Sequence, residues 1–180
     1  PPHLASSAAS DVYKRQSLAD AIAALSFDYE LAILAKLNEV GGLELFYPYF
    51  KAGQLQGKLI LVIDVADDLL QQLKVEAPSV KVLDNGTKKY LLSAEQLITV
   101  HPLSVRSITF APTARLTQAM LEQHFGHTDL TRVSGEHVTH YLYPALGLDI
   151  RIDEKGKDLL QYVAPKHFQA SQQRMRIKDA

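Results

Sequence analysis

The sequence predicts an α+β fold in which short helices pack on antiparallel strands. Apolar residues recur at steps of three and four in some segments and alternate with polar residues in others, which are the periods of helices and strands. Turn sequences such as Asp84-Asn85-Gly86 separate alternating segments, as in hairpins. Both patterns occur on each side of Pro102, which predicts two small units, 17–102 and 103–165, joined near His101-Pro102.

The first sixteen residues stand apart from this pattern. Residues 6–16 read SSAASDVYKRQ, a small polar string that resembles the translation of a transposase adapter used to prepare sequencing libraries. We therefore expect residues 1–16 to be an artefactual or disordered tail that the fold does not need. A natural disordered tail is the alternative. If the adapter interpretation holds, the natural N-terminus is missing, so a signal peptide, lipid anchor or membrane helix upstream is not excluded.

The composition is that of a folded protein without a strong charge. The chain has 180 residues, 47% of them apolar, which is enough for a core. Its 19 basic and 20 acidic residues favour neither nucleic acid nor a membrane surface as a partner. With no cysteine, it has no disulfide or thiolate site. No apolar run approaches the roughly 20 residues of a membrane span.

The first unit opens with a predicted long helix at 17–40. Its apolar residues from Leu18 to Val40 form one stripe, and Gly41-Gly42 is the expected stop. The aromatic segment 43–54 is predicted to be an irregular connector because Pro48 disfavours regular structure. Strict alternation then predicts a strand at 55–65, where Gly53 and Gly57 indicate a turn and a close backbone approach.

Three shorter elements complete the first unit. Asp67 is expected to cap a short helix that ends before Pro78. Residues 80–92 form a predicted hairpin around the Asp-Asn-Gly turn. Ser93 and Gln96 have the capping-box spacing of a further short helix.

The second unit reads as one helix on a β-meander. Residues 105–110 alternate as in a strand, and Thr117 is expected to cap a helix at 116–125 that stops at Gly126. Four further strands follow from the alternating segments and the turns between them: 130–133, 137–143, 148–152 and 159–163. The polar tail at 166–180 is expected to fray.

The titratable residues of the second unit do not predict a metal or cofactor site. His137 and His140 are three residues apart on a predicted strand, so they point to opposite faces and cannot hold one ion. Asp149 and Asp153 are expected on the solvated face, with Arg151 between them. The chain contains no G-x-S-x-G nucleophile motif and no phosphate-binding glycine loop.

The second unit resembles the SmpA/OmlA (BamE) outer-membrane lipoprotein family and related β-lactamase-inhibitor-like modules. The resemblance covers 116–163, under a third of the chain, and depends on a helix from Thr117 to Phe125-Gly126, the Tyr141-Leu142-Tyr143 element, Asp153, Gly156 and Tyr162. The chain departs from that family at His127-Thr128, where proline is usual, and at Tyr141, where tryptophan is usual. The resemblance implies a non-catalytic envelope protein that works through contact with another envelope protein.

Two classes of function are therefore open. The first is an interaction module of the bacterial periplasm or envelope, which would use an aromatic patch of Tyr141, Tyr143, Asp149 and Arg151 opposite the helix-covered face of the sheet. An ordinary solvated face is the alternative for this patch. The second class is a small hydrolase that uses histidine, aspartate and tyrosine residues of the same sheet: His137, Asp149, Asp153 and Tyr141.

Overall fold

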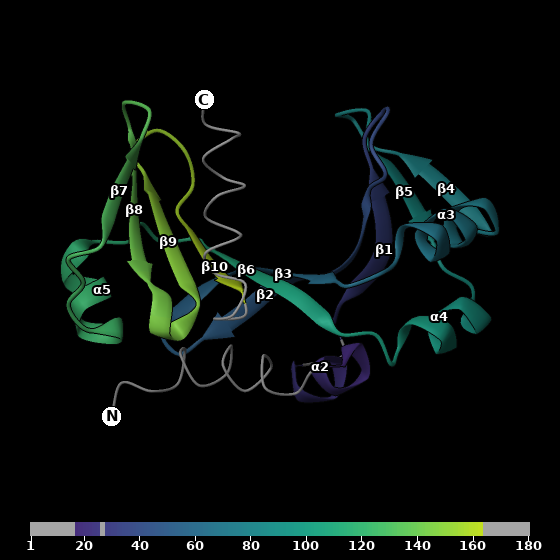
Figure 1. Ribbon diagram of the computed structural model, residues 1–180, viewed down its shortest axis with the longest axis horizontal. Helices are drawn as coiled ribbons and strands as arrows, with labels where there is room; N and C mark the ends of the chain where they lie inside the picture. The colour runs from purple at the N-terminus through teal and green to yellow at the C-terminus, as the bar shows by residue number, and fades with distance from the viewer. Residues whose placement is uncertain (1–16, 26–27, 164–180) are drawn as a thin grey trace. The chain divides into compact units, whose positions relative to one another are not determined.

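The chain has an α+β fold, as the sequence predicts, in the computed structural model of Figure 1, which describes residues 17–25 and 28–163. The tails expected at 1–16 and 166–180 lie outside the described residues. Helices are α2 (Leu18–Leu25), α3 (Asp67–Val75), α4 (Ala94–Val100), α5 (Gln118–Phe125) and the 3-10 turn η1 (Pro144–Leu146). Strands are β1 (Glu30–Ala35), β2 (Gly42–Ala52), β3 (Leu55–Ile63), β4 (Ser79–Val82), β5 (Lys88–Leu91), β6 (Val105–Pro112), β7 (Thr131–Ser134), β8 (Val138–Tyr143), β9 (Leu148–Asp153) and β10 (Leu159–Val163).

The described residues sort into two compact units that interleave along the chain. The N-terminal unit contains 17–47 and 60–106, and the C-terminal unit contains 48–59 and 107–163. The strands pair in the order β4-β5-β1-β2-β3-β6-β10-β9-β8-β7. This division differs from the boundary expected near His101-Pro102, because β2, β3 and β6 each contribute residues to both units.

The segment around the expected boundary is part of the N-terminal unit. Leu18 N donates to Leu103 O at 2.7 Å, and Asp64 N donates to Ser104 O at 2.8 Å. These bonds fasten the start of α2 and the end of β3 to residues 103–104, so a linker is not found there. No helix in 17–25 or 28–163 is long and apolar enough to cross a membrane.

The long helix expected at 17–40 is wrong. Helix α2 ends at Leu25, and 30–35 form β1, which pairs with β2 on one side and β5 on the other. Ala32 and Ile33 point to opposite faces of the sheet and are both buried. When a short segment is apolar on both faces, its sequence does not alternate, so periodicity cannot distinguish a strand from a helix. This explains the error.

The irregular connector expected at 43–54 is also wrong. Strand β2 runs from Gly42 to Ala52, and its alternate residues Leu43, Leu45 and Tyr47 are buried. Pro48 is tolerated because it follows Phe46, the last β2 residue that is paired with β1. Residues 43–47 alternate in the sequence as a strand should, but Pro48 led to the prediction of a connector.

The ends of the short helices follow local chemistry, with one correction. Ser93 and Gln96 form the predicted capping box at the start of α4, and Gln96 Nε2 also donates to Leu73 O at 3.1 Å. The N-cap of α3 is Ala66 rather than Asp67, and it makes no side-chain cap bond. Asp67 instead lies in the first turn, where a carboxylate stabilises the positive end of the helix.

The hairpin and the meander were predicted correctly. In the β4–β5 turn, Gly86 has a positive φ of 79° and Asn85 Oδ1 accepts a bond from Thr87 N at 3.1 Å. In the C-terminal unit, Thr117 accepts a bond from Met120 N at the start of α5, and Gly126 ends the helix with a φ of 85°. Strands β7 to β10 follow in the expected order.

Gly57 marks the predicted close approach of two backbones. A Cβ placed there would lie 2.2 Å from Ala111 O and 2.7 Å from Pro112 Cα, both in β6. The backbone of β3 can therefore lie this near β6 only because residue 57 has no side chain.

We expect Gly57→Ala to lower the free energy of unfolding by about 2 kcal/mol, because the new methyl group must displace backbone atoms. Gly42→Ala is the matched control, since a Cβ there meets no heavy atom within 4 Å. Urea unfolding of both variants tests this. Equal stability of the two would contradict the close approach.

Candidate functional site

The register of β8 and β9 sorts the candidate residues onto two faces of the C-terminal sheet. Tyr141 lies opposite Ile150 and Tyr143 opposite Leu148, whereas Leu142 lies opposite Asp149. Residues directly opposite each other in an antiparallel pair share a face. The predicted patch of two tyrosines with Asp149 and Arg151 is therefore wrong, because the tyrosines share the face of Leu148 and Ile150.

Tyr143 belongs to the core under α5. It is 7% exposed, and its ring centroid lies 5.7 Å from that of Phe125. Its hydroxyl donates to Gly126 O at 3.0 Å, and burial raises its pKa. The helix therefore covers the face of Leu148 and Ile150, as predicted, and this face includes the tyrosines that the sequence placed on the other side.

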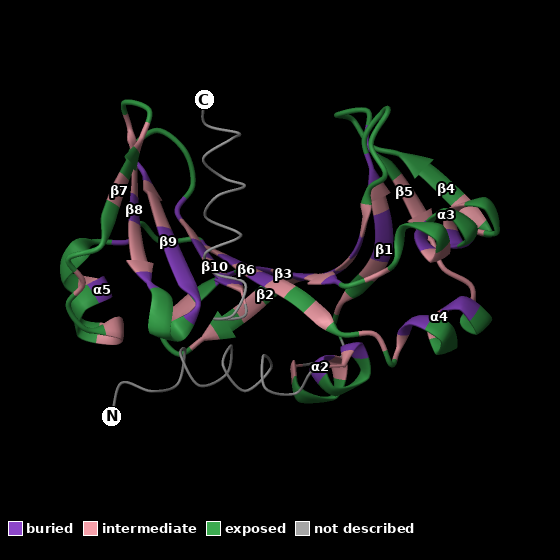
Figure 2. Cartoon of the chain, viewed as in Figure 1, coloured by how far each residue is buried: buried purple, intermediate pink, exposed green. Residues whose placement is uncertain are grey.

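The opposite face contains a buried histidine–aspartate pair that the sequence did not predict. His140 Nδ1 lies 2.8 Å from Asp149 Oδ1, and the two side chains are only 7% and 4% exposed. The expected solvated position of Asp149 is therefore wrong. Figure 2 shows β9 largely buried, as is usual for a strand with partners on both sides.

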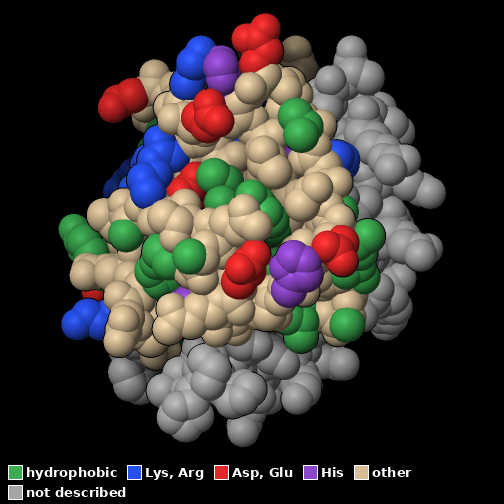
Figure 3. All heavy atoms as spheres, turned by 90° about the vertical axis from the view of Figure 1, so that its left-hand side faces the viewer, with side chains coloured by type: hydrophobic (Ala, Val, Ile, Leu, Met, Phe, Trp, Pro, Cys, Tyr) green, Lys and Arg blue, Asp and Glu red, His purple; other side chains and the backbone are tan. Residues whose placement is uncertain are grey.

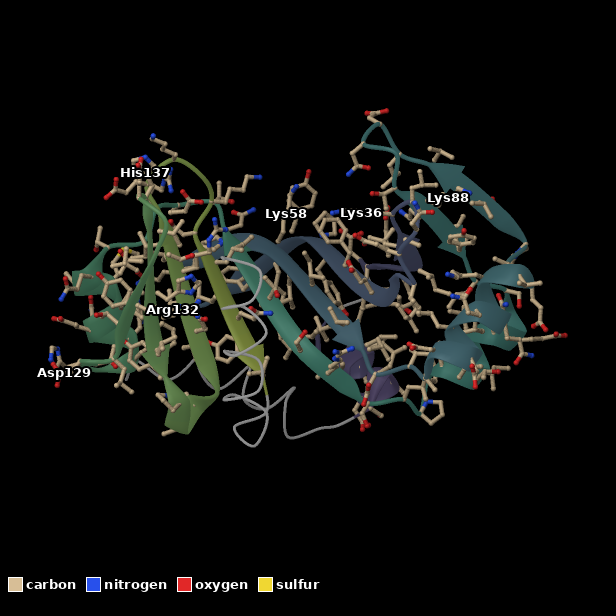
Figure 4. All side chains as sticks on the ribbon, turned by 45° about the horizontal axis from the view of Figure 1, so that its top comes forward. Lys36, Lys58, Lys88, Asp129, Arg132 and His137 are labelled. Atoms are coloured by element: carbon tan, nitrogen blue, oxygen red, sulfur yellow. The ribbon has the colours of Figure 1, made fainter. Side chains whose placement is uncertain are left out.

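Two arginines flank this pair in the neighbouring strands. Arg132 of β7 and Arg151 of β9 both lie directly opposite His140, so the three share a face. Arg151 donates to Asp153 Oδ2 at 2.5 Å. Figure 4 labels Arg132 on β7, away from the turn that precedes β8. Acidic and basic residues thus alternate along this face of β9 as Asp149, Arg151 and Asp153, where the sequence predicted a solvated surface.

The turn between β9 and β10 is held by two buried carboxylates. Asp153 Oδ1 accepts from Gly156 N at 2.7 Å and from Lys155 N at 3.1 Å. Asp158 accepts from Leu116 N at 2.8 Å and from Asp153 N at 3.0 Å. The bond from Gly156 is the main reason that the pKa of Asp153 is lowered. The solvated position expected for Asp153 is thus also wrong.

The four residues of the hydrolase hypothesis do not converge. His137 precedes β8, and its ring lies 3.5 Å from Glu154 and 3.6 Å from Glu136. Counted in steps of two from Tyr143, Tyr141 and His137 fall on the helix-covered face, whereas Asp149 and Asp153 fall on the other face. His137 and His140 therefore lie apart, as the strand prediction required.

A further histidine, just after the end of α5, lies between two carboxylates. His127 lies 2.8 Å from Asp129 and 3.4 Å from Glu122, and the bond to Asp129 is the main reason that its pKa is raised. On the side shown in Figure 3, acidic, basic and apolar side chains are interspersed. Within the described ranges, no group of three or more His, Cys, Asp or Glu could hold a metal ion.

Comparison with known proteins does not place the chain in a family. None of the protein-family models, curated proteins or solved structures compared with it matches. The resemblance of the second unit to the outer-membrane lipoprotein family stays a prediction. The function must therefore be inferred from the geometry of the chain itself.

We expect His140 and Asp149 to be strongly coupled in stability. Replacing either with leucine should lower the free energy of unfolding by about 3 kcal/mol, since the buried partner loses its hydrogen bond. The double variant should be more stable than the sum of the two losses implies. A double-mutant cycle by urea unfolding measures this, and losses that add within about 0.5 kcal/mol would contradict it.

Asp153 should make the stability of the fold depend on pH in acid. Its folded pKa lies below the unfolded value of about 3.9, so its contribution is complete above about pH 5 and is lost as pH falls through the folded pKa. The stability difference between the natural chain and Asp153→Asn should be constant from pH 7 to 5 and shrink below about pH 4. Glu39→Gln, on an exposed loop, is the control.

Proposed function

We propose that this chain is a non-enzymatic protein-interaction module of the bacterial envelope. The supporting observation is that seven of the eleven large exposed apolar side chains among the described residues belong to the N-terminal unit. Val80 and Val82, on the short strand β4, are 47% and 68% exposed. The other members of this set come from loops and helices of the same unit: Leu37, Val40, Val75, Leu83 and Ile98. Exposed apolar side chains of this kind are available for contact with a partner.

The C-terminal sheet supports the non-enzymatic part of this proposal. A histidine that acts as a base needs access to substrate and a nucleophile within hydrogen-bond reach. His140 is buried, and among the described residues its hydrogen bond is to Asp149. Asp153, Asp158 and Tyr143 are likewise engaged in bonds that hold the turn and the helix. These groups stabilise the unit, and in the described part of the chain the four residues of the hydrolase alternative do not come together in one site.

The compartment is proposed from the resemblance of the C-terminal unit. A helix on a four-strand meander, with Tyr141-Leu142-Tyr143 on the second strand and Gly156 in the last turn, is the outline that resembles the outer-membrane lipoprotein family. A comparison of cell fractions tests this compartment directly.

The immobilised full chain should bind a protein saturably from the envelope fraction of a Gram-negative bacterium and not from its cytosol. Excess free chain should compete with the immobilised chain for this protein, because the number of specific binding sites is limited. The chain should not hydrolyse chromogenic ester, amide or phosphoester substrates in a way that depends on His140. Any background hydrolysis should be the same in the His140→Gln variant. Saturable binding from cytosol alone would overturn the compartment, and His140-dependent turnover would overturn the non-enzymatic assignment.

A further inference from the structure

Strand β4 lies at one end of the strand order and has one unpaired edge. It pairs with β5 along Ser79 to Val82, and no other described strand lies beyond it. Figure 2 shows β4 as exposed. An edge strand presents backbone N–H and C=O groups that can pair with another extended chain. Its side chains determine which chain that can be.

The two valines of β4 extend the apolar face of the N-terminal sheet to its edge. Val80 lies opposite Tyr90, Tyr90 opposite Ile33, and Ile33 opposite Leu43, so all four share one face. Ile33 and Leu43 are fully buried, but Val80 and Val82 are not covered. The row from Leu43 to Val80 is therefore apolar, with Lys88 beside it opposite Val82, and it ends at β4 without a strand partner among the described residues.

The edge is basic between the two valines. Lys81 points to the other face and is exposed, and Lys88 is exposed beside Val82. Figure 4 labels Lys88 on this hairpin. Lys89, opposite Lys81, forms an ion pair with Glu30. The hairpin 79–91 contains one acidic residue, Asp84, against its three lysines.

We propose that β4 binds an extended segment of the partner protein by strand addition, and that this segment carries an apolar–acidic–apolar triplet. This inference rests on the proposed function and names the partner's chemistry. Residues directly opposite each other in paired strands interact most strongly. Val80 and Val82 therefore select apolar residues on one face, and Lys81 selects a carboxylate on the other.

A second copy of the chain fits this edge less well. If two β4 strands paired antiparallel with Val80 of one copy opposite Val82 of the other, Lys81 of one copy would lie opposite Lys81 of the other. Like charges directly opposite each other destabilise a strand pair. If the pairing shifts so that Val80 lies opposite Val80, Lys81 lies opposite Ser79, so neither register gives Lys81 a carboxylate. Charge complementarity thus favours an acidic segment over self-association.

The probe is a fluorescein-labelled ten-residue peptide with a central Val-Glu-Val triplet, and its control has Val-Lys-Val. Fluorescence anisotropy with the full chain should show binding of the glutamate peptide that is roughly fivefold tighter than that of the lysine peptide. Lys81→Glu should reverse this preference. Lys157→Glu, an exposed lysine of the C-terminal unit, is the matched control and should leave it unchanged.

Two N-methylated versions of the glutamate peptide test the backbone pairing. Methyl groups on alternate residues block one edge of the peptide, so one version should lose binding and the complementary version should keep it. Equal binding of both, or a preference that Lys81→Glu does not change, would overturn the proposal. A dimer in sedimentation that competes with the peptide would overturn it in favour of a second copy.

The failure of this inference differs from the failure of the proposed function. If Lys81→Glu and Val80→Thr leave the envelope capture unchanged, strand addition at β4 is wrong and the interaction function stands. If the natural chain captures nothing, the proposed function itself is wrong. Both variants change exposed side chains, and their melting temperatures should stay within about 2 °C of the natural chain.

Discussion

The carboxylate of Asp158 is the contact on which the C-terminal unit depends. It is 2% exposed and accepts bonds from Leu116 N, just before α5, and from Asp153 N, at the end of β9. Arg115 lies 3.2 Å away and balances the charge. A buried carboxylate is costly without partners, so this set of donors fixes the start of the helix against the turn of the meander. The packing of α5 over Leu148 and Ile150 follows from that attachment.

Buried polar groups also bond to one another on the other face of this sheet. His140 and Asp149 satisfy each other between strands, and Arg151 bonds to Asp153, which in turn holds the backbone of the turn. Polar groups that resemble the parts of a catalytic site thus act together as structural bonds. The exposed side chains of Val80 and Val82 in the N-terminal unit are the surface that the proposed interaction function would use. The burial of these residues, rather than their chemical type, is the reason that the interaction module is proposed over the hydrolase.

Features set by a few neighbouring residues were predicted well from the sequence. The Ser93–Gln96 capping box, the Asp84-Asn85-Gly86 turn and the Thr117 cap all depend on contacts within four residues. Strands β1 and β2 were missed because their burial is decided by distant segments. The positions of Tyr143 and Asp149 were missed for a related reason: a one-residue change in register moves every side chain of a strand to the other face. The register between β8 and β9, which η1 connects, could not be predicted from the alternation of either strand alone.

The interleaving of the two units has a consequence for the order of folding during synthesis. The N-terminal unit has all of its residues once position 106 has left the ribosome, although its segments 17–47 and 60–106 are separated in the chain. Residues 48–59 are made early, yet their unit is complete only when position 163 has emerged. Contacts between segments so far apart form slowly, because a long loop must close first. The parts of β2 and β3 in residues 48–59 therefore pack fully only after β6 to β10 have been made, and surface left unpacked until then is the kind that chaperones bind.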